Sequence, residues 1–173
     1  MSYHSPEPGH SGTTPYDGYA EPGYGLRSRA FPFYIVCDVS HSMWVDRKDG
    51  HQTPFEILST CIPELLFELE TGDLVVSEAA HVSIIAFHDK VHEVLPLVRP
   101  CDAPDVPALP KGGQTDYRLV FGTLRQVIER DCAALAREYQ LKTPMVFFIT
   151  DGEPFVGDRR QPPEVWRPAR DQL

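Results

Sequence analysis

The chain has 173 residues and a formal net charge of −9 at pH 7, which suits one globular domain with a tail. The acidic excess, without any cluster of lysine and arginine, disfavours nucleic acid as a partner, because a phosphate backbone requires concentrated positive charge. No basic leader and no membrane-length apolar run is present, so the sequence predicts a cytoplasmic protein without a signal peptide or membrane contact.

The first 30 residues are rich in Gly, Pro, Ser and Tyr and almost lack aliphatic side chains. Such a segment buries too little apolar surface to offset its ordering entropy. We therefore expect residues 1–30 to be a disordered tail and residues 31–173 to form the domain. The four cysteines form no Cys-x-x-Cys pair, and three of them (Cys37, Cys61 and Cys132) stand among apolar residues. This usage is typical of reduced thiols that lie mostly in the core.

The domain opens with a strand and a helix. The run FYIVCDV, residues 33–39, is typical of a strand buried on both faces. After a polar loop at 45–52, Thr53, Pro54 and Glu56 match an N-cap, a first helical position and a capping box. Pro63 predicts a kink in this helix. The apolar residues at helical spacing are Phe55, Leu58, Ile62, Leu65, Leu66 and Leu69.

Residues 81–89 and 91–98 are spaced as a hairpin, and an irregular proline-rich segment follows. A second helix then carries an inner stripe, and the run MVFFIT at 145–150 predicts another strand buried on both faces. The stripe consists of Val120, Leu124, Val127, Ile128, Leu135 and Tyr139. Alternating strands and helices predict an α/β fold with a doubly wound, mostly parallel sheet and one antiparallel hairpin edge.

Oxygen-bearing side chains follow the first and last of these strands. Asp38 ends one and Asp151 follows the other, and the carboxyl ends of neighbouring parallel strands meet at one sheet edge. Two carboxylates at close range repel, so a divalent cation between them is expected. In an extended turn, Ser40 and Ser42 both project the same way as Asp38, and Thr115 could add a third hydroxyl. An all-oxygen set favours Mg²⁺, Mn²⁺ or Ca²⁺ over zinc.

These residues together resemble the metal-ion-dependent adhesion site of von Willebrand factor A (VWA) domains. The resemblance rests on DVSHS at 38–42, on Thr115 and on FFITDGEP at 147–154, and it covers residues 31 to about 155. The glycine-containing loop before Thr115 and the TDGEP run are most similar to the bacterial cytoplasmic branch associated with tellurium resistance. The resemblance implies a VWA, Rossmann-like fold.

The resemblance also implies a role for each residue. Ser40 and Ser42 would ligate the metal directly, Thr115 would bind it directly or through water, and Asp38 and Asp151 would hold waters and hydroxyls around it. Hydroxyl ligands leave the ion electrophilic, so its open position would accept an Asp or Glu carboxylate from another protein. This implies a metal-dependent protein-binding module, rather than an enzyme, in a stress or tellurium-resistance complex.

Two features depart from the family's pattern. Gln114 separates Thr115 from Gly112 and Gly113, the glycines that would let the loop approach the site, so Asp116 is an alternative site residue. The family fold also continues beyond the TDG strand with a helix, a strand and a last helix. Here the remaining chain is enough for one helix start, so we expect the last strand and helix to be missing. The strand at 145–150 would then be an exposed apolar edge.

Two other functions stay open. A phosphatase or phosphotransferase of the haloacid-dehalogenase type also binds Mg²⁺ beside an aspartate after its first strand. That chemistry needs an acid two residues on, where this chain has Ser40. A VWA accessory subunit of an ATP-driven chelatase or remodelling machine would share the site, and its ATPase would be a separate chain because no Walker A loop occurs here.

The remaining candidates are less specific. His88 and His92 flank the hairpin turn at a spacing that could hold a metal, but solvated turn residues are the favoured interpretation. His41 would lie at the rim of the metal site and could contact a partner. Met43 and Trp44 either form an apolar rim beside the ion or pack in the core.

Overall fold

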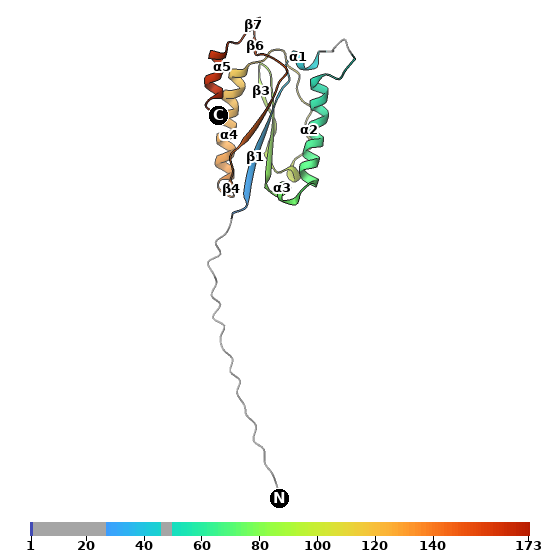
Figure 1. Ribbon diagram of the computed structural model, residues 1–173, viewed down its shortest axis with the longest axis vertical. Coiled ribbons are helices and arrows are strands. Elements are labelled where there is room, and N and C mark those ends of the chain that lie inside the picture. The colour runs from blue at the N-terminus through green and yellow to red at the C-terminus, as the bar shows by residue number, and fades with distance from the viewer. Residues whose placement is uncertain (2–26, 46–49) are drawn as a thin grey trace.

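The computed structural model describes Met1 and residues 27–45 and 50–173. Most of the predicted tail (2–26) and part of the polar loop (46–49) lie outside the described residues. The fold is α/β, as expected, with helices on both faces of a mixed, mostly parallel sheet (Figure 1). Within these ranges, no helix combines the length and the apolar character that crossing a membrane requires.

The elements alternate along the chain. The strands are β1 (Arg29–Asp38), β2 (Ala80–Phe87), β3 (Val91–Val98), β4 (Gln140–Leu141), β5 (Met145–Ile149), β6 (Phe155–Val156) and β7 (Arg159–Arg160). The helices are α1 (His41–Trp44), α2 (Pro54–Thr71), α3 (Leu74–Ala79), α4 (Tyr117–Leu135) and α5 (Pro163–Arg170), with a 3₁₀ turn, η1 (Pro100–Asp102).

Strand β1 is the centre of the sheet. It pairs in parallel with β2 along its length, and on its other side it pairs in parallel with β4 and then β5. β3 pairs antiparallel with β2 and forms one edge of the sheet, which confirms the predicted hairpin edge. β6 and β7 form a separate antiparallel pair. The carboxyl ends of β1, β2 and β5 therefore meet at one edge of the sheet.

The sequence of β1 explains its central place. Tyr34 and Val36 pack in the core beneath α4, whereas Ile35 and Cys37 pack in the core beneath α2. Both faces are buried, as the apolar run predicted. The strand begins at Arg29, four residues before the predicted start, because short β4 extends the pairing of β1 at that end.

Helix α2 begins as its sequence predicts. The Thr53 hydroxyl accepts from the Glu56 amide at 3.2 Å, and the Glu56 carboxylate accepts from the Thr53 amide at 2.8 Å. The helix runs through Pro63 to its end at Thr71. The predicted stripe is wrong for Leu65, whose side chain is 42% exposed. The buried residues of the stripe are Leu58, Ile62 and Leu66.

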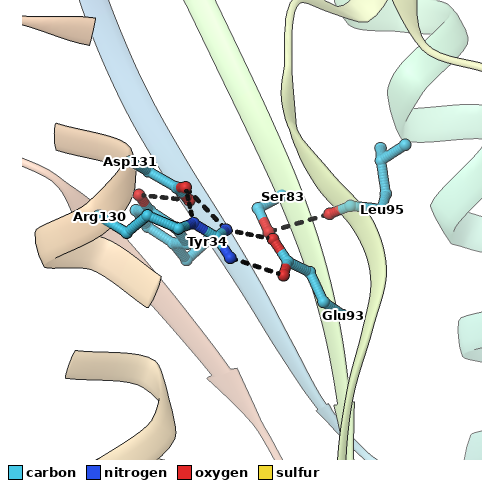
Figure 2. A network of polar contacts seen from close by, with 6 residues as sticks. All are labelled: Tyr34, Ser83, Glu93, Leu95, Arg130 and Asp131. Carbon is cyan, nitrogen blue, oxygen red and sulfur yellow. Dashed lines mark hydrogen bonds and ion pairs between the residues drawn. The ribbon is translucent and has the colours of Figure 1, made fainter. Parts of the chain in front are cut away.

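A polar network fixes α4 to the sheet (Figure 2). The buried Asp131 carboxylate accepts from the Tyr34 hydroxyl of β1 at 3.3 Å and from Arg130 Nε at 2.8 Å. Arg130 also forms a two-pronged pair with Glu93 of β3, at 3.1 and 2.5 Å. Burial, and then the Asp131 charge, raise the pKa of Tyr34. Asp131 thus places a buried polar side chain on the inner face of α4, which the apolar periodicity of the helix did not predict.

Strand β5 is the element that differs most from its prediction. We predicted burial on both faces, which is wrong, and an exposed apolar edge, which is confirmed. Phe148 packs against Phe87 and Phe121 on the α4 side. Phe147 points the other way and is 52% exposed. It lines an apolar hollow of about 330 Å³ that is shared by Phe33, Ile35, Leu65, Leu69, Val82, Phe147 and Ile149.

The last segment is more ordered than the single helix start we expected. Residues 155–160 form the β6–β7 hairpin, in which Gly157 adopts a φ of 60°. α5 follows and packs against α4 through Trp166, whose ring lies 5.6 Å from that of Tyr117. The sequence analysis did not predict this hairpin, whose two turn residues are Gly157 and Asp158. Within the described ranges, the chain after β5 thus returns to the α4 face and leaves the α2 side of β5 exposed.

All four cysteines lie in the described ranges and are free. Cys37 is buried in β1, where burial and then Asp38 raise the pKa of its thiol to about 12. Cys61 is exposed, so its predicted place in the core is wrong, because it faces outward from α2. Cys101 is exposed and Cys132 is half-buried.

Candidate metal centre at the sheet edge

The two predicted carboxylates follow neighbouring strands. Cys37 of β1 lies opposite Ile149 of β5 in a parallel pair. Asp38 and Asp151 therefore leave the sheet at the same edge, as expected.

A short helical turn brings the two serines together. Ser40 is the N-cap of α1 and Ser42 lies within its single turn, so the expected extended turn is wrong. The two hydroxyl oxygens nevertheless lie 3.3 Å apart, because the side chain of an N-cap residue points toward the first turn of its helix, where Ser42 is the second residue. Ser42 donates onward to Asp151 Oδ1 at 2.8 Å. The result is a line of oxygens from Ser40 through Ser42 to Asp151.

Asp38 anchors this turn from below. Its side chain is 1% exposed; Oδ1 accepts from the Ser40 amide and Oδ2 from the Thr150 hydroxyl, each at 2.8 Å. Burial raises the pKa of Asp38, the hydrogen bonds from Ser40 and Thr150 oppose that rise, and the charge of Asp151 adds to it. A nearby cation would favour the ionised form of this carboxyl.

Thr150 is a site residue that the sequence argument missed. Besides its bond to Asp38, its hydroxyl oxygen accepts from the Gly152 amide at 3.3 Å and lies 3.1 Å from the Tyr117 hydroxyl. The Tyr117 hydroxyl donates to the Gly152 carbonyl at 2.7 Å. The only signal for Thr150 was its place directly before Asp151.

The loop that carries Thr115 lies against the serine turn. The Gly112 amide donates to the Val39 carbonyl at 2.9 Å, and the His41 amide donates to the Gly113 carbonyl at 3.1 Å. Thr115 is 6% exposed, and its amide donates to the Phe155 carbonyl. Among the described residues, no hydrogen bond joins its side chain to the other four. The structure thus links four predicted residues directly and places the fifth on the adjoining loop.

The alternative residue, Asp116, has a different role. It is the N-cap of α4, and its Oδ1 accepts from the Leu119 amide and from Gln161 Nε2, both at 2.9 Å. The preceding Gln114 accepts from the Gly157 amide at 2.9 Å. These bonds fix the loop register and assign the Asp116 carboxylate to the helix end.

The residues after the serines brace the site. Met43 is buried in the core on the α2 side, so of its two predicted roles it has core packing and not the apolar rim. Trp44 donates from Nε1 to the Gly112 carbonyl at 3.0 Å, and Lys111 lies over its ring at 5.4 Å. His41 is exposed beside Trp44, with ring centroids 4.6 Å apart. Trp44 therefore holds the glycine loop, and His41 remains at the rim.

The two hairpin histidines differ from their favoured interpretation. His88 is 7% exposed, so it is not a solvated turn residue, and its Nε2 lies 3.0 Å from Nε2 of His92. A Cβ at position 112 would overlap the His88 ring. The glycine that we expected to allow close approach to the carboxylates is therefore required by His88 instead.

The donor set at the β1–β5 edge fits a hard divalent cation. Ser40, Ser42 and Asp151 offer oxygen only, as Mg²⁺ and Ca²⁺ prefer. Asp38 and Ser40 are buried, while Ser42 and Asp151 are exposed, so an ion here would face solvent on one side. Across the described ranges, no group of three or more His, Cys, Asp or Glu side chains is placed to hold an ion. The candidate centre at the β1–β5 edge differs from such a group, because two of its oxygen donors are the hydroxyls of Ser40 and Ser42.

Neither a family model nor a curated protein matches the chain.

Proposed function

We propose that this protein is a protein-binding module of the VWA type that binds Mg²⁺, with Mn²⁺ or Ca²⁺ as substitutes. The observation that carries the proposal is the line of oxygens from Ser40 through Ser42 to Asp151, buried at one end and open at the other. Asp38 holds the Ser40 amide, and Thr115 would complete the ligand set from the adjoining loop. A bound ion would supply an electrophilic position for a partner's Asp or Glu carboxylate.

Each side chain has a distinct task in this proposal. Asp38 has both oxygens occupied by protein donors, so it positions the serine turn rather than ligating the ion. Ser40 and Ser42 place neutral oxygens on the ion, and Asp151 orients Ser42 by accepting a hydrogen bond from its hydroxyl. Little negative charge then touches the cation, which leaves it attractive to a carboxylate from outside.

The finer fold and the setting belong to the same proposal. Helices on both faces of a mostly parallel sheet and the exposed side of β5 support a doubly wound VWA, Rossmann-like fold, whose further strand and helix would adjoin β5. The motif resemblance supports work in the cytoplasm, in a stress or tellurium-resistance complex. An accessory role beside an ATP-driven chelatase would use the same site.

The phosphatase alternative has less support. A nucleophilic Asp38 would need an exposed oxygen, yet the residue is buried and both of its oxygens accept hydrogen bonds. Ser40 stands where that chemistry needs a general acid. We therefore favour binding over catalysis.

Calorimetric titration of Mg²⁺ and Mn²⁺ into the full chain tests the metal. We expect saturable binding that Asp151→Asn weakens at least about tenfold, or about 1.4 kcal/mol. Asp151 is preferred to Asp38 because it is exposed, so its replacement should leave the fold intact. Asp105→Asn, which removes the same charge from an exposed site elsewhere, should bind as the wild type does. Equal binding by Asp151→Asn, or none by folded wild type, would contradict the proposal.

The partner requires a separate measurement. Proteins captured by the immobilised wild-type chain should be released by a chelator and restored by Mg²⁺, and Ser42→Ala should capture none of them. Blocking carboxyl groups on the captured protein should abolish its binding. Capture that resists the chelator would place the binding surface elsewhere on the molecule.

A further inference from the structure

A second constellation lies at the β2–β3 turn and takes no part in the proposed function. His88 directly follows β2, and His92 belongs to β3, opposite Ala86. The two strands are antiparallel neighbours, so the tight turn between them brings both imidazoles to the same face. Their ring centroids are 5.1 Å apart, with 31° between the planes.

The nitrogens that face each other have defined roles. His88 Nδ1 contacts the carboxylate of Asp89. A carboxylate can only accept hydrogen bonds, so this nitrogen of His88 carries a proton. In the neutral ring, Nε2 of His88 then holds a lone pair, directed at Nε2 of His92 at 3.0 Å. The pair must share one proton between these two nitrogens or bind something in its place.

The surroundings hold the pair in position and disfavour a charge on His92. His88 is buried beneath the backbone of Gly112, its amide donates to the Lys90 carbonyl, and its carbonyl accepts from the Asp116 amide. Burial, and then His88 and Lys90, lower the pKa of His92, while Asp89 opposes that change. A neutral imidazole is the form that ligates metals.

We propose that His88 and His92 together bind a transition-metal ion of the Zn²⁺, Ni²⁺ and Cu²⁺ class through their Nε2 atoms. Two nitrogens at about 2.0–2.1 Å from such an ion, at angles between about 90° and 110°, are about 2.9–3.4 Å apart. The separation of 3.0 Å falls in this range. Imidazole favours these metals over Mg²⁺, and Asp89 on the far nitrogen of His88 is the partner that metal-binding histidines typically have.

The ion would have open positions. The described residues supply no third His, Cys, Asp or Glu at this place, so water or a side chain of another molecule would complete the coordination. Because the His88 carbonyl accepts from Asp116 and its ring supports Gly112, the ion would clamp the hairpin turn to the loop that carries Thr115. Binding would displace the shared proton and therefore weaken in acid.

Zn²⁺ titration by calorimetry, with Co²⁺ absorption as a second readout, tests this site. All chains should carry His4→Gln and His10→Gln, because those imidazoles could also bind metal. We expect one ion per chain, with affinity reduced at least about tenfold by His92→Gln. His41→Gln, which removes an exposed imidazole from the same end of the sheet, should bind as its parent does.

Equal affinity in folded His92→Gln, or no saturable binding by its parent, would overturn the proposal and leave a shared proton only. Should His92→Gln fail to fold by circular dichroism, Asp89→Asn decides, since loss of such a partner weakens metal binding about 10–100-fold. Asp89→Asn that binds as its parent would also overturn it. The proposal does not rest on the magnesium site, so Asp151→Asn should keep its Zn²⁺ affinity. Loss of Zn²⁺ in that variant would assign the ion to the β1–β5 edge.

Discussion

Asp38 is a buried carboxyl whose charged form the fold alone disfavours. Its raised pKa means that the folded state binds a proton more readily than the unfolded state. Stability should therefore fall as pH rises from the ordinary carboxyl pKa through the raised value, and the deficit should persist at neutral pH. Such a charge is typical of a site kept for binding rather than for stability.

Asp38→Asn is accordingly expected to be more stable than the wild type at about pH 7 in metal-free buffer, and this advantage should shrink at about pH 4. The amide keeps an acceptor for the Ser40 amide and removes the charge. Urea unfolding at both pH values measures the difference in free energy.

Asp105→Asn, at an exposed position, is the matched control and should differ from the wild type by less than about 0.5 kcal/mol at both pH values. A less stable Asp38→Asn at neutral pH would show that the hydrogen bonds of the carboxylate outweigh its burial.

Local chemistry made part of the site predictable. Four site residues could be identified because they follow apolar strands: Asp38, Ser40, Ser42 and Asp151. The carboxyl ends of neighbouring parallel strands meet at one sheet edge, which predicted that these residues lie close together. His88 could not be placed in the same way. It stands in a polar turn, and its ring lies against Gly112, which is distant in sequence.

Among the elements, β5 has an open edge. Among the described residues it pairs only with β1, so in these ranges the backbone groups on its other side have no strand partner, and apolar side chains flank them. Edges of this kind promote association between chains.

We predict concentration-dependent self-association of the isolated chain, reduced by Phe147→Lys. The charge would lie on the exposed side of β5, where it opposes strand addition. Analytical ultracentrifugation across a concentration series measures the effect. Phe67→Lys, at a phenylalanine of α2 that is 61% exposed, controls for general loss of apolar surface. Equal reduction by both variants would implicate surface hydrophobicity rather than the edge.

Helices and strands could be predicted from the sequence where the interactions that form them lie within a few residues. The start of α2 was evident because Thr53 and Glu56 cap it within one turn. α1 and α3 were missed because four and six residues are too few to show a period. The exposure of β5 depends on which neighbours a strand acquires, and its apolar run was equally consistent with burial.

At the scale of the molecule, one sheet separates two cores. Leu58 and Ile62 pack on one face, and Leu124 and Val127 pack on the other. Since β1 contributes to both, loss of either core should destabilise the whole sheet. The alternation of strands and helices predicted this architecture, but it did not predict that β4 and β5 share one side of β1.

Leu124→Ala should reduce the free energy of unfolding by about 2–5 kcal/mol, because removing a fully buried side chain leaves a cavity. Urea unfolding followed by tryptophan fluorescence and by circular dichroism should give coincident transitions. Leu119→Ala, on the exposed face of the same helix, should cost much less. Separate transitions for the two probes would show that the cores unfold independently.

The pairing of β1 with β5 also determines when the residues of the proposed magnesium site can come together during folding. The bond between Ser42 and Asp151 joins residues 109 positions apart, and that between Asp38 and Thr150 spans 112. Closing such long loops is entropically costly and slow. During synthesis, the serine turn emerges early, and Asp151 follows only 109 positions after Ser42. A nascent chain that has not yet passed β5 lacks Asp151 and therefore cannot complete the proposed magnesium site. Binding of the ion would then indicate that synthesis has passed β5.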